Sequence, residues 1–256
     1  MMNLNKSRLK IASKAMALHF LGSLSVALVV GILVFGVWFP YPYRQLAGGT
    51  ELFFLIMGID LVCGPLLTLV LFNPIKPRRE LAIDLGLVVF VQLTALAYGM
   101  WSLHLARPLY LVYEVDRFKV IARVDLDASE FNKLPYLLQV QPFRGPQIIG
   151  LRKPTEEERK RVMFESSQGG RDYGERPSFY APYDVTNAAK AYLRAKPIAD
   201  FAKKYPSKQA DIDKLQLQVG GDGKQLRYLP IIARQDWVAV LNSKSEIVGY
   251  VQGDGF

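Results

Sequence analysis

Residues 52–72 read LFFLIMGIDLVCGPLLTLVLF, an apolar run that carries one carboxylate, Asp60, followed by the pair Gly64-Pro65. A run of this length indicates a bilayer-spanning helix, because one crossing takes about 20 apolar residues. A charged side chain at such depth costs about 2.5–3.5 kcal/mol on insertion scales, so it usually has a partner or a function. The segment therefore predicts a membrane protein and makes Asp60 the first candidate site residue.

Two further apolar runs, residues 15–39 and 81–103, flank this segment. Each is long enough to cross a bilayer once at a rise of about 1.5 Å per residue. No comparable run follows in the rest of the chain. The sequence therefore predicts three transmembrane α-helices within residues 1–105, followed by one soluble α+β domain in residues 106–256.

The first run could instead be a cleaved secretory signal. Such signals have an apolar region of about 7–15 residues that ends at a small-residue cleavage site of the A-x-A type. The run at residues 15–39 is longer, and residues 37–43 read VWFPYPY, an aromatic belt without such a site. The pattern favours an uncleaved membrane span.

Basic residues in the short loops predict the orientation, because Lys and Arg there stay on the cytoplasmic side. The tail before the first run has four basic residues and no acidic one, and the loop at residues 73–80 has three basic residues. The loop between the first two runs has only Arg44. We expect a cytoplasmic N-terminus, which in a bacterium gives a multi-pass inner-membrane protein with a periplasmic C-terminal domain.

The formal net charge of +9 is spread over both regions. Residues 1–105 contain 8 Lys and Arg against 4 Asp and Glu, an excess that the topology explains. The remaining 24 against 19 is a mild excess without a basic run, which argues against nucleic-acid binding. Cys63 is the only cysteine, so the outer domain is expected to be held by packing without an intramolecular disulfide.

The pattern of residues 106–256 predicts a small antiparallel sheet with helices packed on one face. The expected strands are residues 109–115, 118–124, 226–233, 237–241 and 247–251, with a turn at 116–117. The expected helices are residues 125–138, 155–164 with a capping box, two short helices within 185–205 broken at Pro197, and 208–217.

The outer domain lacks the side chains of several common catalytic and metal sites. It has no histidine and no cysteine, which removes Cys/His zinc sites and histidine-based nucleophilic catalysis. Residues 220–223, GGDG, lie between an expected helix and an expected strand, so they predict a turn rather than a phosphate-binding loop. We expect no catalytic residue, no metal, no cofactor and no small-molecule substrate.

The second span supplies four candidate partner-binding residues, Asp60, Gly64, Pro65 and Thr68, and the third span supplies a fifth, Gln92. Two interpretations of Asp60 remain open. Asp60 could hydrogen-bond Gln92, Thr68 or a neighbouring backbone group and order the bundle, or it could accept a cation from another membrane protein. Gly64 and Pro65 should kink the span or free a carbonyl, which gives either the shape of the bundle or a docking groove.

His19 and Asp84 lie a few residues from the expected cytoplasmic face, one in the first span and one in the third. Ionisable groups inside a membrane tend to pair with one another. The sequence therefore predicts a structural pair between these two side chains.

The order of these motifs resembles that of bacterial type IV pilin accessory proteins of the TfpX/TfpZ group. The resemblance covers the full length and is densest over residues 16–120. The segments that carry it are VWFP at 37–40, GID at 58–60, GPLLT at 64–68, FNP at 72–74, Asp84, ARP at 106–108, YEVDRF at 113–118 and GYV at 249–251.

The resemblance implies an inner-membrane protein, not an enzyme, that promotes the stability or assembly of a type IV pilin. The spans would shelter the transmembrane helix of the pilin among membrane lipids, and the outer domain would meet its head. It also favours a partner-binding role for Asp60. Two alternatives come from other classes: a periplasmic sensor that signals through a cytoplasmic partner, and an envelope enzyme acting on lipid-linked sugar.

Overall fold

The computed structural model describes residues 2–135, 138–141, 143–220 and 225–256, with the backbone alone for residues 2–7. The chain divides into two compact units. The first unit comprises Met1–Val37 and Gly49–Leu105, and the second comprises Trp38–Gly48 and Ala106–Phe256.

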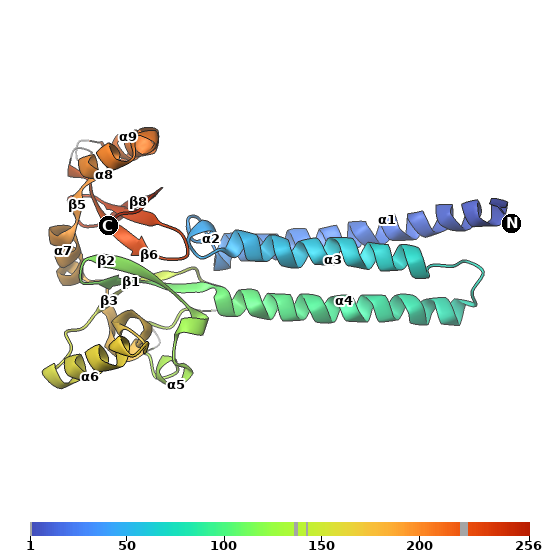
Figure 1. Ribbon diagram of the computed structural model, residues 1–256, viewed down its shortest axis with the longest axis horizontal. Helices are drawn as coiled ribbons and strands as arrows, with labels where there is room; N and C mark the ends of the chain where they lie inside the picture. The colour runs from blue at the N-terminus through green and yellow to red at the C-terminus, as the bar shows by residue number, and fades with distance from the viewer. Residues whose placement is uncertain (1, 136–137, 142, 221–224) are drawn as a thin grey trace. The chain divides into compact units, whose positions relative to one another are not determined.

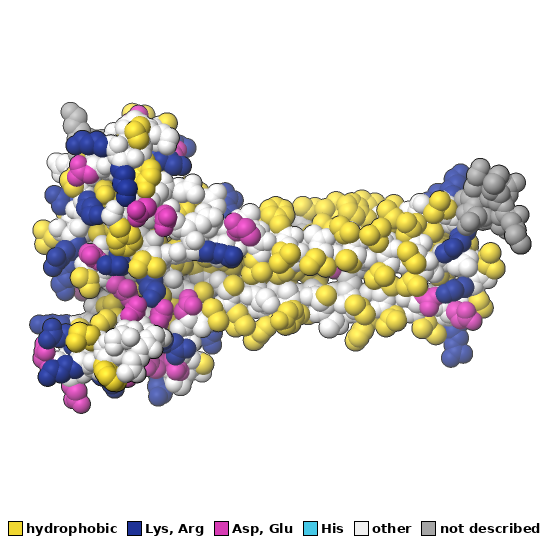
Figure 2. Space-filling model, viewed as in Figure 1, with side chains coloured by type: hydrophobic (Ala, Val, Ile, Leu, Met, Phe, Trp, Pro, Cys, Tyr) yellow, Lys and Arg dark blue, Asp and Glu magenta, His cyan; other side chains and the backbone are white. Residues whose placement is uncertain are grey.

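The first unit contains the three predicted spans, which are confirmed as long apolar helices (Figure 1). They are α1 (Met2–Leu33), which continues as the π-helical turn η1 (Val34–Trp38), α3 (Gly49–Leu71) and α4 (Arg78–Ala106). Large apolar side chains point outward along these helices (Figure 2). Water would solvate such a surface poorly and hydrocarbon solvates it well, so the chain is a membrane protein.

Pro65 lies inside α3, and the helix continues beyond it to Leu71. Because proline has no N–H, one carbonyl a turn earlier lacks its intrahelical partner. Membrane helices tolerate such a position where neighbouring groups re-satisfy the backbone.

The segment between the first two spans belongs to the second unit rather than to the transmembrane region in which the sequence placed it. Its short helix α2 (Tyr43–Leu46) buries Tyr43 and Leu46 in a core shared with strands of the α+β domain. The backbone N–H of Arg234 also donates to the carbonyl of Leu46. Aromatic and aliphatic burial therefore makes this loop part of the domain.

The second unit is an α+β domain, and its described residues form an eight-stranded sheet. Its strands are β1 (Pro108–Glu114), β2 (Arg117–Ala122), β3 (Gln147–Leu151), β4 (Tyr180–Pro182), β5 (Lys196–Pro197), β6 (Arg227–Ile232), β7 (Trp237–Leu241) and β8 (Ile247–Gln252). The order is β4-β3-β1-β2-β6-β7-β8, with β5 also paired to β6.

The expectation of a purely antiparallel sheet is wrong, because β1 pairs with β3 and β2 with β6 in parallel. Each of these pairs is joined through a long connection, as parallel pairing requires. The predicted hairpin β1–β2 and the closing strands β6, β7 and β8 are antiparallel as expected. The hairpin turn lies at Val115-Asp116, one residue earlier than predicted.

Helices cover both faces of the sheet, which corrects the prediction of a single covered face. Alternate residues of a strand point to opposite faces. In β7, Ala239 packs in a core with Ala191 of α7 (Val185–Arg194), whereas Val240 packs in a core with Phe201 of α8 (Ile198–Lys204). A further core, around Tyr110, fills the β3 side of the sheet.

The remaining helices follow the predicted pattern with one exception. They are α5 (Ala128–Phe131), α6 (Glu156–Ser167) and α9 (Gln209–Val219), with 3-10 turns η2 (Arg123–Asp125), η4 (Tyr173–Glu175), η5 (Pro177–Phe179) and η6 (Pro206–Lys208). The predicted helix at 125–138 is reduced to α5, whose N-cap Asp127 accepts from the Ser129 N–H. Residues 136–137 of that prediction, and residues 221–223 of the predicted glycine turn, lie outside the described part of the chain.

Candidate membrane-embedded partner site

A polar cluster joins the three spans at His19. Its Nδ1 lies 2.6 Å from Oγ1 of Thr68 in α3, and its Nε2 lies 2.7 Å from Oε1 of Gln92 in α4. Hydrogen bonds between membrane helices, with close packing, hold such bundles together because lipid supplies no hydrophobic force between them. The imidazole therefore links α1 to both other spans.

The amide of Gln92 has its orientation set by its neighbours. Its Nε2 donates to Oγ of Ser23, at 2.9 Å, and to the backbone carbonyl of Asp60, at 3.2 Å. A carbonyl oxygen can only accept, so the nitrogen of the amide must face α3 and its oxygen must face His19. Gly64 makes room for this amide, because a Cβ there would clash with Oε1 of Gln92.

Asp60 is held in the bundle by a hydrogen bond to its backbone carbonyl, and its carboxylate takes no part in that contact. The residue is only 9% exposed. In the described part of the chain, no hydrogen bond or ion pair reaches the carboxylate, whereas the backbone carbonyl accepts from Gln92. The backbone carbonyl of Asp60 and the hydroxyl of Thr68 therefore help to order the bundle, as one of the two interpretations expected. The carboxylate of Asp60 does not contribute to this order.

Two apolar cavities border Asp60. One, of about 460 Å³, lies between α3 and α4 and is lined by Ile59, Asp60 and Gly99 among others. The second, of about 490 Å³, is lined by residues of α1, α3 and α4, including His19 and Asp60. Helix α4 buries little of its apolar surface, since 6% of its most apolar stretch is buried. The carboxylate thus borders space that the three helices do not fill.

The predicted pair of His19 with Asp84 is wrong. His19 is satisfied by Thr68 and Gln92, and Asp84 forms an ion pair with Lys76 in the preceding loop. Lys76 lies two residues before the start of α4, and Asp84 lies within the second turn of that helix. A nearby cation in the loop and neutral polar partners deeper in the bundle satisfy the two groups separately.

The structure therefore brings together most of the predicted partner-binding residues. Asp60, Thr68, Gly64 and Gln92 lie at the cluster or its cavities, whereas Pro65 is buried in α3 and lines neither cavity. Sequence reasoning did not assign Ser23 to the site. Its position four residues after His19 gives a usable signal, because residues at i and i+4 share one face of a helix.

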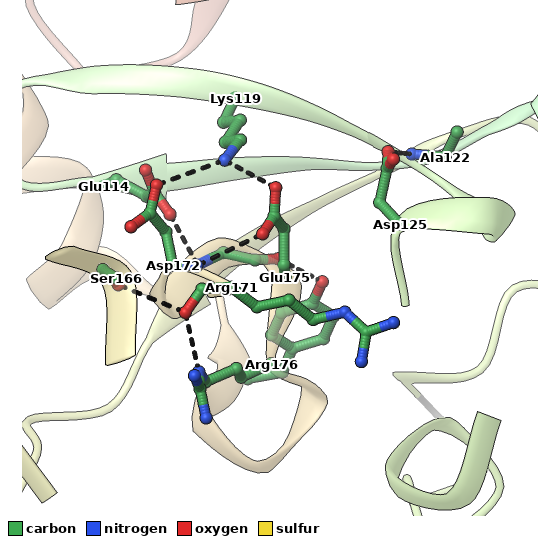
Figure 3. A network of polar contacts seen from close by, with 11 residues as sticks. Glu114, Lys119, Ala122, Asp125, Ser166, Arg171, Asp172, Glu175 and Arg176 are labelled. Atoms are coloured by element: carbon green, nitrogen blue, oxygen red, sulfur yellow. Dashed lines mark hydrogen bonds and ion pairs between the residues drawn. The ribbon is translucent and has the colours of Figure 1, made fainter. Parts of the chain in front are cut away.

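A second polar network lies in the α+β domain (Figure 3). Lys119 Nζ lies 2.8 Å from Oε1 of Glu175 and 3.5 Å from Oδ2 of Asp172, and Glu114 accepts from the N–H of Gly174. Burial raises the pKa of the Glu114 carboxyl, and the charge of Lys119 opposes that rise. These contacts fasten η4 to β1 and β2, so the network has a structural role.

Metal binding finds no support in the described ranges. Among residues 2–135, 138–141, 143–220 and 225–256, no group of three His, Cys, Asp or Glu side chains is placed to hold a metal ion.

The fold and this cluster define a class: a membrane protein with three apolar helices, a buried carboxylate beside open cavities, and an α+β domain in the rest of the chain. A family model described as "Fimbrial assembly protein FimB" matches residues 7–48. No solved structure matches the chain.

Curated relatives extend the match to the whole chain. The chain is 35% identical over 257 residues to the fimbrial assembly protein of serogroup I of Dichelobacter nodosus, covering 99% of each protein. The relative from serogroup E1 gives the same identity and coverage. The relative from serogroups C1 and C2 is 46% identical over 127 residues, which is half of this chain and 97% of that protein. The chain belongs to this fimbrial assembly protein family and has a role in fimbrial assembly.

Proposed function

We propose that the protein is a non-enzymatic inner-membrane accessory protein for a type IV pilin, of the TfpX/TfpZ kind, and that its spans shelter the transmembrane helix of the subunit before assembly. The observation that carries the proposal is the carboxylate of the buried residue Asp60, which has no partner among the described residues and borders the cavity between α3 and α4. The names of the relatives, fimbrial assembly proteins, supply the class of partner.

The cavity suits the side chains of one face of a partner helix. Helices in lipid associate by close packing where small residues let backbones approach. The two glycines that border this cavity, Gly64 and Gly99, are already covered by the side chains of Gln92 and Ile56, so a partner helix would contact the apolar walls of the cavity. Because α3 and α4 leave this volume open, the helix of a partner can pack there without displacing a tight interface.

The charge of the cavity selects the partner. An ionised carboxylate at membrane depth is costly, and a cation brought by the partner offsets that cost. A pilin enters the membrane as a hydrophobic N-terminal helix, and its terminal amine is such a cation. The amine of the subunit would pair with Asp60 while the helix fills the cavity.

The orientation completes the proposal. Basic residues in the N-terminal tail and in the loop before α4 favour a cytoplasmic N-terminus, with the α+β domain in the periplasm beside the head of the subunit. A reporter active only in the periplasm, fused after Phe256, should give signal. Signal from a reporter active only in the cytoplasm at the same position would overturn the topology.

Site-specific photocrosslinking tests the sheltered helix. Ile59 lines the cavity between α3 and α4, whereas Val62 lines neither cavity, and both side chains are 55% exposed. A photoreactive residue at position 59 should capture the pilin in intact cells, and the same residue at position 62 should not. Equal capture at both positions, or crosslinks at position 59 to lipid alone, would refute a helix in the cavity.

The carboxylate is tested separately. Asp60→Asn keeps the size of the side chain and removes its charge, so crosslinking from position 59 should fall by about tenfold if the ion pair is made. Asp84→Asn is the matched control, because Asp84 is already paired with Lys76. Unchanged capture of the pilin by Asp60→Asn would refute the proposed ion pair but not the packing of the helix in the cavity. Normal pilin levels and piliation in a deletion strain would refute the whole proposal.

A further inference from the structure

A cavity of about 570 Å³ in the α+β domain lies apart from the membrane cluster, and nothing in the proposed function uses it. Its walls come from the β1–β2 turn, the end of β3, the start of α6, η4 and α7. All four charged side chains that line it are cations: Arg152, Arg159, Lys190 and Arg194.

Two of these cations are already neutralised. The guanidinium of Arg152 donates to both carboxylate oxygens of Glu158, at 2.9 and 2.8 Å. Arg159 donates to Glu156 at 2.7 Å. These two arginines therefore contribute little net charge to the cavity.

The other two cations remain uncompensated. Lys190 and Arg194 lie one turn apart on α7, so their side chains share a face, and like charges at this spacing repel. Within the described ranges, neither makes an ion pair or a hydrogen bond. Burial raises the pKa of Tyr113 in the cavity wall to about 12, and the charge of Arg194 opposes that rise, so this charge is felt inside the cavity.

Two further features of the wall indicate a binding site. The hydroxyl of Tyr173 is buried and has no hydrogen-bond partner among the residues described, although buried polar groups nearly always have one. Val115 adopts a φ of +50°, which is strained for a β-branched residue, and its side chain lines the cavity. Strained backbone concentrates at functional sites, and a buried hydroxyl without a partner marks a position where a functional role is expected.

The apolar part of the wall defines the kind of anion. Leu151, Pro154 and Leu193 line the cavity beside the cations, so a ligand must bring apolar groups next to its negative charge. We propose that this cavity binds an acidic peptide segment whose carboxylates meet Lys190 and Arg194 and whose apolar side chains contact the leucines. A free phosphate would leave those apolar walls uncovered.

Peptide binding to the full-length protein in lipid nanodiscs tests this inference. The probe is a fluorescein-labelled hexapeptide with two glutamates and two leucines, and its control has glutamines in place of the glutamates. Fluorescence anisotropy should give at least about tenfold tighter binding of the glutamate peptide, as expected for two charge pairs made with cations that have no partner among the described residues. The double variant Lys190→Gln, Arg194→Gln should remove that preference.

The matched control is Lys160→Gln with Arg161→Gln. These exposed cations on α6 do not line the cavity, and their replacement removes the same net charge from the same domain. Their loss should change the affinity by less than about twofold, because these side chains lie outside the cavity and their attraction at a distance is screened by salt. Equal weakening by both double variants would show general charge attraction and overturn the site. Displacement of the peptide by inorganic phosphate at equal concentration would also overturn it, in favour of a phosphate site.

Discussion

Nε2 of His19 lies 2.7 Å from Oε1 of Gln92, and this contact determines the role of that ring nitrogen. The amide oxygen can only accept, so Nε2 donates. Nδ1 lies 2.6 Å from Oγ1 of Thr68, a hydroxyl that can donate or accept. One histidine thereby links α1, α3 and α4.

Replacing Gln92 should loosen the attachment of α4. Gln92→Leu removes the bonds to His19, to Ser23 and to the carbonyl of Asp60. Interhelical hydrogen bonds in membranes contribute about 0.6 kcal/mol each on average, so we expect a loss of about 1–2 kcal/mol in the free energy of unfolding, measured by SDS titration in mixed micelles. Phe90→Ala, at a lipid-facing position of α4 that is 68% exposed, should change it much less. A loss no larger for Gln92→Leu than for Phe90→Ala would contradict the role of the amide.

Glycine at position 64 should be required for the same contact. The Cβ of Gly64→Ala would clash with Oε1 of Gln92, so the amide must move away from α3. Overpacking of this kind costs about 1–3 kcal/mol, measurable in the same titration. Gly58→Ala, on the same helix, is the control, because a Cβ at Gly58 meets nothing within 4 Å. If both alanines were tolerated equally, the packing of Gln92 against Gly64 would be refuted.

The spans were predictable because hydrocarbon imposes a length and a composition on each helix. The hairpin β1–β2, the capping box of α6 and the break between α7 and α8 at Pro197 were predictable because local signals determine them. The parallel pairs of β1 with β3 and of β2 with β6 were not, because contacts far apart in sequence select them. Strand β3 is also short and follows a segment rich in glycine and proline.

Most residues of the polar cluster could be predicted from the sequence, but which of their side chains contact one another could not. Asp60, Thr68 and Gln92 stand out as polar residues in apolar helices, but a sequence does not give the rotation of one helix against another. His19 and Asp84 are two ionisable residues near the expected cytoplasmic face of the membrane, and the sequence therefore suggested that they pair. The rotation of α1 instead directs His19 to Thr68 and Gln92.

The separation of His19 from Asp84 gives two substitutions with different expected costs. His19→Leu leaves Thr68 and Gln92 without their shared partner, so it should lower the free energy of unfolding by about 1–2 kcal/mol. Asp84→Asn breaks only a partly exposed ion pair with Lys76 and should cost less than about 1 kcal/mol. Combining both substitutions should give additive losses, because the sites share no contact. Strong coupling between the two substitutions in a double-mutant cycle would instead indicate a direct contact between His19 and Asp84.

The pH dependence of stability should reveal the ion pair at the start of α6. Hydrogen bonds from Arg152, and then from the Thr155 N–H, lower the pKa of Glu158 from 4.5 to about 2. Because the folded pKa is the lower one, this contribution is complete above about pH 4.5 and is lost as the pH falls towards 2. Glu158→Gln should therefore lower the Tm of the detergent-solubilised protein at pH 7, and the difference from wild type should shrink below pH 4.5.

Glu157→Gln is the control for this titration. Glu157 is exposed on the first turn of the same helix and forms no ion pair within the part of the chain that the structure describes. Its replacement removes the same charge near the helix N-terminus, where a carboxylate gains only a modest dipole interaction. The Tm difference for Glu157→Gln should be smaller at pH 7. If the two variants lost the same Tm at pH 7, the dipole alone would account for the effect, and the contact with Arg152 would contribute nothing measurable to stability.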